Sequence, residues 1–139
     1  MDTFPVKLPL RLDWSEMDLF GHVNNVAYFK FIQASRVHYW ELTGLAAAFS
    51  TTKVGPILLS TGCQFMKPLH YPGNIVVEVR MEFIKNTSFG LHHRILNNAG
   101  DIAAEAHDVI VTFDFSKNEK VPVSDEFRAA VERIERREL

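Results

Sequence analysis

The chain has 139 residues, of which 47% are hydrophobic and 23% are charged, and its formal net charge is -2. This length and composition indicate a single globular domain over residues 1–139, with a hydrophobic core of its own. The slight negative charge provides no general attraction for polyanions, so we expect no nucleic-acid partner.

The cysteine content and the N-terminal sequence indicate the cellular compartment to expect. The only cysteine, Cys63, cannot form an intrachain disulfide, and the N-terminus lacks the basic and apolar segments of a secretory signal. We therefore expect a reducing, cytoplasmic setting. No run of residues approaches the roughly 18 consecutive apolar positions of a membrane-spanning helix, so we predict no membrane span.

The N-terminal third predicts one strand and one long helix. Apolar residues alternate with polar ones over residues 6–14, as in a half-buried strand. After a turn at Gly21, Asn24 or Asn25 can cap a helix that ends near Gly44. Apolar residues lie almost all around this helix, so we expect it to be buried and wrapped by a sheet.

The remainder of the chain predicts a sheet and a final helix. The hydrophobic period changes to two, and the predicted strands lie near residues 57–67, 74–85, 89–97 and 102–115. Short, turn-rich connections between them favour antiparallel pairing. A last helix follows Ser124, with an apolar face that includes Phe127 and Val131. We expect its charged residues to remain solvated, namely Glu132, Arg133, Glu135, Arg136 and Arg137.

This order of elements predicts an α+β fold in which an antiparallel sheet packs around one long helix. A single open sheet leaves exposed edges, and a helix that is apolar on all sides leaves part of its surface uncovered. Two copies that join their sheets relieve both problems, so we predict a homodimer or a dimer of dimers.

The segment 18–25 carries the strongest chemical signal. Asp18 and the Gly21 turn lead directly into the long helix, which aims a carboxylate at a helix start. The first amides of a helix have no intrahelical acceptor and carry the positive end of the helix dipole. The segment therefore predicts a base or nucleophile beside an oxyanion hole.

A family resemblance follows from these residues. The signature consists of residues 14–18 (Trp-Ser-Glu-Met-Asp) followed by Gly21, His22, Val23, Asn24, Asn25 and Tyr28. It resembles that of the hotdog-fold acyl-CoA thioesterases, in particular the 4-hydroxybenzoyl-CoA thioesterase-like family. The resemblance runs from about residue 8 to residue 115. It implies a five-stranded antiparallel sheet wrapped around the long helix, a dimer with joined sheets, and active sites at the subunit interface.

The resemblance also implies catalytic roles. Asp18 corresponds to the catalytic acid, either as general base or as a nucleophile that forms a mixed anhydride. Gly21 forms the tight turn, and Asn25 acts through its backbone amide. Apart from the resemblance, His22 in the same turn is a candidate to orient the substrate or Asp18, with a purely local hydrogen-bonding role as the alternative. A thiolate with a pKa of roughly 8.5 is a good leaving group, so no strong general acid is required. We expect no organic cofactor.

Substrate contacts are expected from other parts of the sequence. Tyr28 lies on the helix beside the motif, Thr61 on a strand that approaches the thioester from the partner subunit in similar enzymes, and Lys85 in a segment similar to one that contacts coenzyme A. The adjacent His92 and His93 on one strand would face opposite sides of the sheet. They make a poor metal pair, and we predict no metal.

Several functional alternatives remain open at this stage. The leading hypothesis is hydrolysis of an acyl-CoA thioester to a free acid and coenzyme A, with a fatty acyl group favoured over an aromatic one. A thioesterase acting on acyl carrier protein thioesters is a second hypothesis. A non-catalytic acyl-CoA binding module, in which Asp18 only caps a turn, is a third. No Gly-x-Ser-x-Gly elbow is present, which disfavours an α/β-hydrolase.

Overall fold

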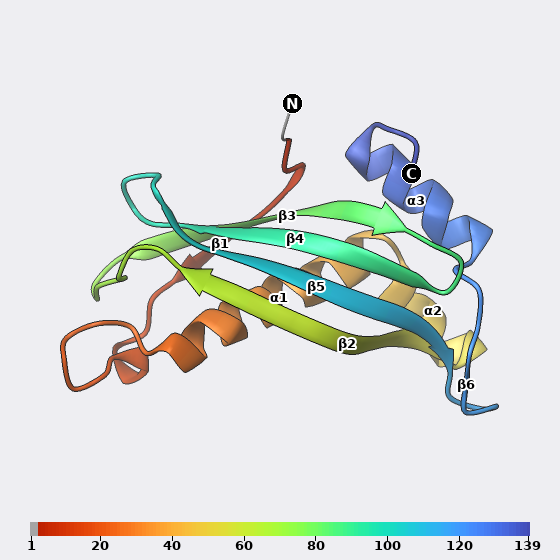
Figure 1. Cartoon of the computed structure of the whole chain (residues 1–139), viewed down its shortest axis with the longest axis horizontal. Helices are drawn as coiled ribbons and strands as arrows, with labels where there is room; N and C mark the ends of the chain where they lie inside the picture. Colours follow the sequence, from red (N-terminus) through yellow and green to blue (C-terminus); the bar gives the residue numbers. More distant parts are fainter. Residues whose placement is uncertain (1–2) are drawn as a thin grey trace.

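The computed structural model describes residues 3–139. Helices and strands are segregated along the chain, with two α-helices followed by a run of strands, in the order expected for an α+β protein (Figure 1). The elements are β1 (Val6–Arg11), the short 3-10 helix η1 (Trp14–Glu16), α1 (Asn25–Leu42), α2 (Leu45–Thr52), β2 (Val54–Phe65), β3 (Asn74–Ile84), β4 (Ser88–Leu96), β5 (Ile102–Asp114), β6 (Glu119–Lys120) and α3 (Asp125–Glu135).

One antiparallel sheet forms the body of the molecule. Its five long strands lie in the order β1-β3-β4-β5-β2, and the two-residue strand β6 pairs with β5. The sheet curves over α1, and α3 packs at the end of the sheet where β3 finishes (Figure 1). The predicted α+β class, the five antiparallel strands around one long helix and the C-terminal helix are confirmed.

Two apolar clusters line the space between α1 and the sheet. The cluster at the N-terminal half of α1 includes Phe31 and Ile32 packed beneath Val77. The cluster at the other half includes Tyr39 and Trp40, which meet side chains from the ends of the strands and from α3. α1 is thus buried on the face toward the sheet. It is not covered all around, since Val26, Phe29 and Val37 are exposed within one chain.

The first strand and the end of the long helix differ from the prediction. β1 ends at Arg11 and not at residue 14, because Asp13 caps η1 by accepting a hydrogen bond from the Ser15 amide at 3.0 Å. Gly44 ends α1 in the left-handed conformation, with φ at 79°, but helix α2 begins at the next residue. The pattern of small residues in α2 gave no periodic signal, so this helix was not predicted.

The position of Glu135 differs from the sequence prediction. We expected it to be solvated, yet it is buried where α3 meets α1 and β3. Its Oε2 atom accepts hydrogen bonds from the Tyr39 hydroxyl at 2.9 Å and the Met81 amide at 3.0 Å. Burial and the nearby carboxylate raise the pKa of Tyr39. Glu135 therefore ties the C-terminal helix to the body of the fold.

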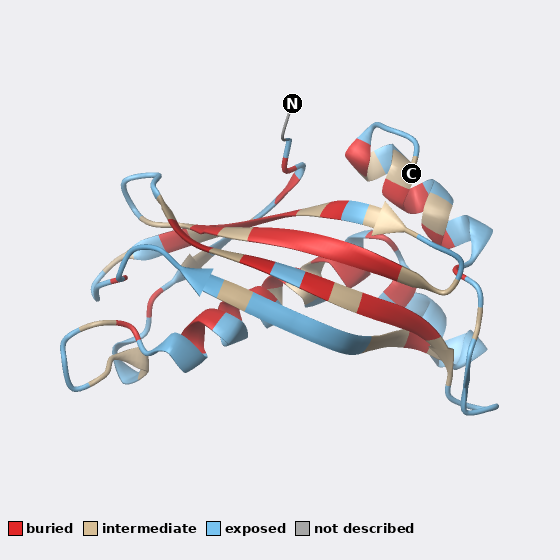
Figure 2. Cartoon of the chain, viewed as in Figure 1, coloured by how far each residue is buried: buried red, intermediate tan, exposed pale blue. Residues whose placement is uncertain are grey.

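Strand β2 is an exposed edge. It pairs with β5, and no other strand of residues 3–139 lies on its second side. Figure 2 shows β2 exposed along most of its length, whereas β4 and β5 are largely buried. Leu59 on this strand is 55% exposed. Within residues 3–139, no helix combines the length and apolar character required to cross a membrane.

Candidate active site

The loop between β1 and α1 is held in place by backbone hydrogen bonds. The Leu12 amide donates to the Gly73 carbonyl at 2.9 Å, and the Val23 amide donates to the Leu69 carbonyl at 2.8 Å. Near the start of α1, the Asn24 amide donates to the Glu16 carbonyl at 2.8 Å. These bonds fix both ends of the loop, so the position of Asp18 within it is defined.

A tight turn at Gly21 shapes the tip of this loop. Gly21 has a φ of 80°, in the left-handed region that glycine adopts without steric cost. The turn allows the Asp18 amide to donate to the His22 carbonyl at 2.7 Å. The predicted turn role of Gly21 therefore agrees with its backbone conformation.

The Asp18 carboxylate is fixed through one oxygen. Its Oδ1 atom accepts hydrogen bonds from the amides of Phe20 at 2.8 Å and His22 at 3.1 Å. In residues 3–139 no group donates to Oδ2. The turn-capping role that sequence alone allows for Asp18 is thus real, but it occupies only half of the carboxylate. The second oxygen remains available for chemistry.

The start of α1 leaves one amide without an acceptor. The Asn24 side chain caps the helix by accepting from the Val26 amide at 2.9 Å, and the Asn24 carbonyl accepts from the Ala27 amide at 2.9 Å. The backbone N–H of Asn25, the first helical residue, has no acceptor in the part of the chain that the structure describes. An amide at this position is suited to bind an oxyanion.

Asp18 and the helix start share one cleft of about 330 Å³, which we call the Asp18 cleft. The helix and the loop before it form one wall, and the end of β2 with the segment after it forms the other. The lining residues are Asp18, His22, Val23, Asn25, Tyr28, Phe65, Met66, Lys67 and Pro68. The cleft brings together Asp18, His22, Asn25 and Tyr28 from the predicted set. Met66 and Pro68 were not predicted, because only the return of the chain after β2 places them here.

Tyr28 forms a rigid part of the cleft wall. Its side chain is buried, and its hydroxyl donates to the Lys67 carbonyl at 3.3 Å. The ring packs edge-on against Phe65, with centroids 5.0 Å apart. Burial raises the pKa of the Tyr28 phenol, so this group stays protonated at neutral pH. Tyr28 therefore shapes the cleft and does not supply a charge.

His22 lies beside a second histidine. Its ring meets that of His70 edge-on with a centroid distance of 4.9 Å, and His70 Nδ1 lies 3.4 Å from the Gly21 carbonyl. The two histidines thus connect the loop before α1 with the segment between β2 and β3. His70 is a feature of this site that the sequence did not predict, because 48 residues separate the two positions along the chain.

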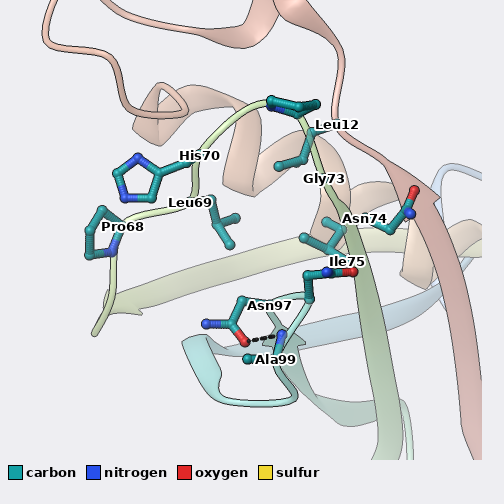
Figure 3. A pocket seen from close by; sticks show the side chains of 11 residues that line it. Leu12, Pro68, Leu69, His70, Gly73, Asn74, Ile75, Asn97 and Ala99 are labelled. Atoms are coloured by element: carbon teal, nitrogen blue, oxygen red, sulfur yellow. Dashed lines mark hydrogen bonds between the residues drawn. The ribbon is translucent and has the colours of Figure 1, made fainter.

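A second cavity, of about 310 Å³, lies on the other side of Pro68. The segment between β2 and β3 and the turn between β4 and β5 enclose it (Figure 3). Leu12, Leu69 and Ile75 give it an apolar floor, and Asn97 at its rim accepts a hydrogen bond from the Ala99 amide at 3.0 Å. No carboxylate is among the residues that line it. We therefore place the chemistry in the Asp18 cleft.

Two predicted substrate residues lie away from the Asp18 cleft within one chain. Thr61 is near the middle of β2, where its hydroxyl donates to Asp108 Oδ1 at 2.7 Å. Lys85 is in the turn between β3 and β4, at the opposite end of the sheet from the loop that precedes α1 (Figure 1). Neither lines the cleft. Their predicted roles therefore depend on a second copy of the chain.

A buried polar network beneath the sheet was missed by sequence reasoning. Asp108 on β5 is 1% exposed, and its Oδ2 atom accepts hydrogen bonds from His93 Nε2 at 2.6 Å and Arg36 Nε at 3.0 Å. Burial by itself would raise the pKa of Asp108. The hydrogen bonds from His93, Arg36 and Thr61 outweigh burial and lower that pKa to about 2. We call these residues, with Ser35, the Asp108 network.

Ser35, His93 and Asp108 superficially resemble a catalytic triad. Ser35 Oγ lies 3.0 Å from His93 Nδ1, and burial lowers the pKa of His93, so the imidazole is neutral. Since Nε2 must donate to the carboxylate, Nδ1 accepts from the Ser35 hydroxyl. Ser35 is 0% exposed, and water or substrate cannot reach it. The network stabilises the fold and is not a nucleophilic site.

His92, His93 and Cys63 show no sign of a catalytic role in the structure. His92 and His93 face opposite sides of the sheet, as their adjacent positions predicted: His93 contacts α1, whereas His92 stacks on His107 on the outer face. Burial raises the pKa of the Cys63 thiol to about 11, so little of the reactive thiolate forms at neutral pH.

Comparison with known proteins now defines the class. The family model of the thioesterase-like superfamily matches residues 12–131. The chain therefore belongs to the thioesterase-like superfamily, and it is a thioester hydrolase. No curated protein has a matching sequence.

Solved structures share this fold. The chain is similar to a thioesterase from Thermus thermophilus solved with coenzyme A and Zn, with a TM-score of 0.87 and 21% identity over 100% of both chains. It is similar to a proposed thioesterase from Pseudomonas aeruginosa, with a TM-score of 0.80 and 29% identity over 90% of this chain and 96% of that one. A dihydroxynaphthoyl-CoA thioesterase from Synechocystis has a TM-score of 0.79 at 14% identity, over 90% and 93% of the two chains.

Proposed function

We propose that the protein hydrolyses acyl-CoA thioesters to a free acid and coenzyme A, with Asp18 as the reacting carboxylate. One observation carries this proposal: Asp18, whose Oδ2 atom is free, and Asn25, whose amide has no acceptor in residues 3–139, line the same cleft. Thioester hydrolysis needs a base or nucleophile on one side of the carbonyl carbon and a hydrogen-bond donor for its oxygen.

The reaction can follow either of two routes. In the first, Asp18 removes a proton from water as the water attacks the thioester carbonyl carbon. In the second, Asp18 Oδ2 attacks that carbon, and water hydrolyses the resulting mixed anhydride. In both routes the Asn25 amide binds the oxyanion, and the C–S bond breaks to release the coenzyme A thiolate. No metal or organic cofactor takes part in either route.

Isotope labelling tests for the second route. A single turnover in ¹⁸O-labelled water, followed by mass spectrometry of the peptide that contains Asp18, tests for an anhydride. Attack of water on the Asp18 carbonyl of the anhydride would leave label in the enzyme and would establish the nucleophilic route. Direct attack of water on the thioester places the label in the product acid alone, and so does attack of water on the acyl carbonyl of an anhydride.

We further propose that two copies join through β2. The free edge of this strand exposes backbone hydrogen-bonding groups together with Leu58 and Leu59, and such edges are normally covered. Antiparallel pairing of two β2 strands about a two-fold axis places the Asp18 end of one sheet beside the Lys85 end of the other. Thr61 then lies close to the axis. This arrangement supports the predicted substrate contacts of Thr61 and Lys85 across the interface, in a dimer or a dimer of dimers.

The dimer proposal is tested by placing a charge at the edge. Leu59→Lys should produce monomers in light scattering at micromolar concentration and should lower thioesterase activity, because the variant buries a charge in the proposed interface. Glu119→Lys on the exposed strand β6 is a matched surface control and should remain dimeric. A wild-type monomer with full activity would contradict the proposal.

The acyl group is proposed to be aliphatic. Large apolar side chains stand exposed at the cleft and beside it, including Leu19, Phe20 and Met66, and they provide a surface for an extended chain. The Phe65 and Tyr28 rings can also pack against an aromatic acyl group. Acyl carrier protein thioesters present the same reacting group on a protein carrier.

Thiol release from aliphatic acyl-CoA, aromatic acyl-CoA and acyl carrier protein thioesters tests these assignments together. Wild-type protein should release thiol fastest from an aliphatic acyl-CoA, and Asp18→Asn should not do so with any substrate. Binding of acyl-CoA by the wild type without thiol release would favour a binding module instead. Faster thiol release from the carrier-protein thioesters would mean that the substrate is an acyl carrier protein thioester. The proposed role of Asp18 would not change.

A further inference from the structure

Three potential metal ligands meet on the outer face of the sheet, away from α1. They are Glu82 on β3, His92 on β4 and His107 on β5, and one ligand atom from each lies within 4.8 Å of the other two. We call them the outer triad. Each comes from a different strand, and these strands are neighbours in the sheet.

Strand register explains why these side chains meet. His92 is directly opposite His107 in the β4–β5 pair, and directly opposite residues point to the same face. The two rings stack with centroids 4.2 Å apart and an interplanar angle of 17°. Glu82 comes from β3, the neighbour of β4 on its other side, and its Oε1 atom lies 2.8 Å from His107 Nδ1.

The two ring nitrogens of His92 are buried without a hydrogen-bond partner among residues 3–139. The residue as a whole is only 8% exposed. The nearest carboxylate oxygen, Glu105 Oε1, lies 3.6 Å from His92 Nε2, which is beyond hydrogen-bonding distance. Buried imidazole nitrogens are normally paired, so an unpaired one beside two further ligands points to a missing partner.

In place of the sequence-based prediction of no metal, we propose that the outer triad binds a divalent transition-metal ion of the Zn²⁺ class. Two imidazoles and one carboxylate suit such an ion, and tetrahedral coordination places neighbouring ligand atoms about 3.4 Å apart. The three ligand atoms now lie within 4.8 Å of one another, so metal binding requires them to move closer and the two stacked rings to rotate until a nitrogen of each points at the ion. Water or Glu105 completes the coordination.

The surroundings are compatible with a bound cation. Neither ring nitrogen of His92 has a hydrogen-bond partner in residues 3–139, and a neutral imidazole has one nitrogen lone pair with which it can bind an ion. Glu82 and Glu105 supply negative charge, whereas Arg80, opposite His92 in register, supplies positive charge that opposes metal binding. The His107 side chain is 56% exposed, which gives the ion a route from solvent.

The proposed metal site is separate from the Asp18 cleft. The outer triad lies on the face of the sheet opposite α1, and no member of it lines the cleft. An ion bound there joins three adjacent strands, so its expected effect is on the stability of the sheet. Metal binding at the outer triad does not depend on the proposed thioesterase mechanism.

Calorimetric titration of the metal-free, untagged protein with ZnCl₂ tests the proposal, with MgCl₂ titrated in parallel. We expect one Zn²⁺ per chain with a dissociation constant of about 10 μM or lower and no measurable binding of Mg²⁺. His107→Asn and Glu82→Gln should each weaken Zn²⁺ binding at least tenfold. His38→Gln, a histidine substitution on α1 outside the outer triad, should leave binding unchanged.

Spectroscopy gives an independent result. Co²⁺ should produce the visible absorption of a tetrahedral site in wild-type protein and not in His107→Asn, and Zn²⁺ should raise the melting temperature of the wild type only. His107 is exposed, so His107→Asn should fold normally. It therefore tests the proposal without the risk of unfolding that a substitution of the buried His92 would carry. Absence of Zn²⁺ binding at 100 μM, or equal binding by His107→Asn and His38→Gln, would overturn the proposal.

Discussion

The Asp18 cleft and the Asp108 network each contain a carboxylate, but they use it in opposite ways. Asp108 is fully buried, and both of its oxygens accept hydrogen bonds from side chains. Asp18 lies in a surface loop, where Oδ1 is held by two backbone amides and Oδ2 is free. A satisfied carboxylate stabilises a fold, whereas a half-satisfied one at a cleft can react.

The same substitution at both sites tests this difference most directly. Asp18→Asn retains an oxygen that can accept the two loop amides but removes the reacting charge. We expect thioester turnover to fall about 1,000-fold, or about 4 kcal/mol in the activation barrier, with little change in melting temperature. Thiol release and thermal unfolding measure the two effects. A variant that retains normal turnover would remove Asp18 from the mechanism.

Asp108→Asn should act mainly on stability. The substitution leaves Arg36 without its buried counter-charge, and breaking a buried ion pair of this kind costs about 3 kcal/mol. For a chain of this length we expect the melting temperature to fall by roughly 10 °C. Urea unfolding at pH 7 measures the change. A loss below about 1 kcal/mol would show that the network contributes little to the fold.

The pH dependence of stability should reveal the buried groups of the Asp108 network. His93 is held neutral because burial lowers its pKa, whereas an unfolded histidine titrates near pH 6.5. The unfolded chain therefore binds the proton first, and metal-free protein should lose up to about 1.4 kcal/mol per pH unit from this group below pH 6.5. Asp108 adds a second loss as pH falls from about 4 toward 2. His93→Gln should flatten the first decline, and equal slopes in the two proteins would contradict this origin.

Two glycines test whether the loop geometry matters for activity. Gly21 and Gly44 have φ of 80° and 79°, and a Cβ atom at either position would meet open space. Alanine at either position should cost about 1 kcal/mol of backbone strain. Only Gly21→Ala should reduce turnover, by about tenfold, since it disturbs the Asp18 turn. Equal activity of the two variants would show that Asp18 tolerates movement of its loop.

Thr61→Val tests the hydrogen bond from the Thr61 hydroxyl to Asp108, for which we expect the smallest effect on stability. It removes the hydroxyl that donates to Asp108 while nearly preserving side-chain shape, so we expect about 1 kcal/mol of destabilisation. Urea unfolding compares it with Ser60→Ala, the neighbouring exposed residue on β2. Matching unfolding midpoints for these two variants would assign no stability to the Thr61 hydroxyl.

Most of the fold followed from local patterns. Alternating and helical hydrophobic periods located the five long strands, α1 and α3, because each pattern reflects which face of an element meets the core. The errors occurred where a side chain overrode the pattern. Asp13 capped η1 and shortened the first strand, Gly44 separated two helices instead of ending one, and tertiary contacts buried Glu135.

The candidate site shows the same division. The sequence alone located Asp18, the Gly21 turn and the start of α1, because these neighbours in the chain build the loop through short-range hydrogen bonds. Only the tertiary structure showed that Asp18 Oδ2 and the Asn25 amide are free.

Strand register decided the remaining features. Residues 93 and 108, and residues 92 and 107, are each 15 positions apart in sequence, yet pairing of β4 with β5 places both pairs in contact. Side-chain type and period give each strand its two faces. The register that aligns one strand with the next depends on turn geometry and on packing against α1, so the Asp108 network and the outer triad emerge only in the folded chain.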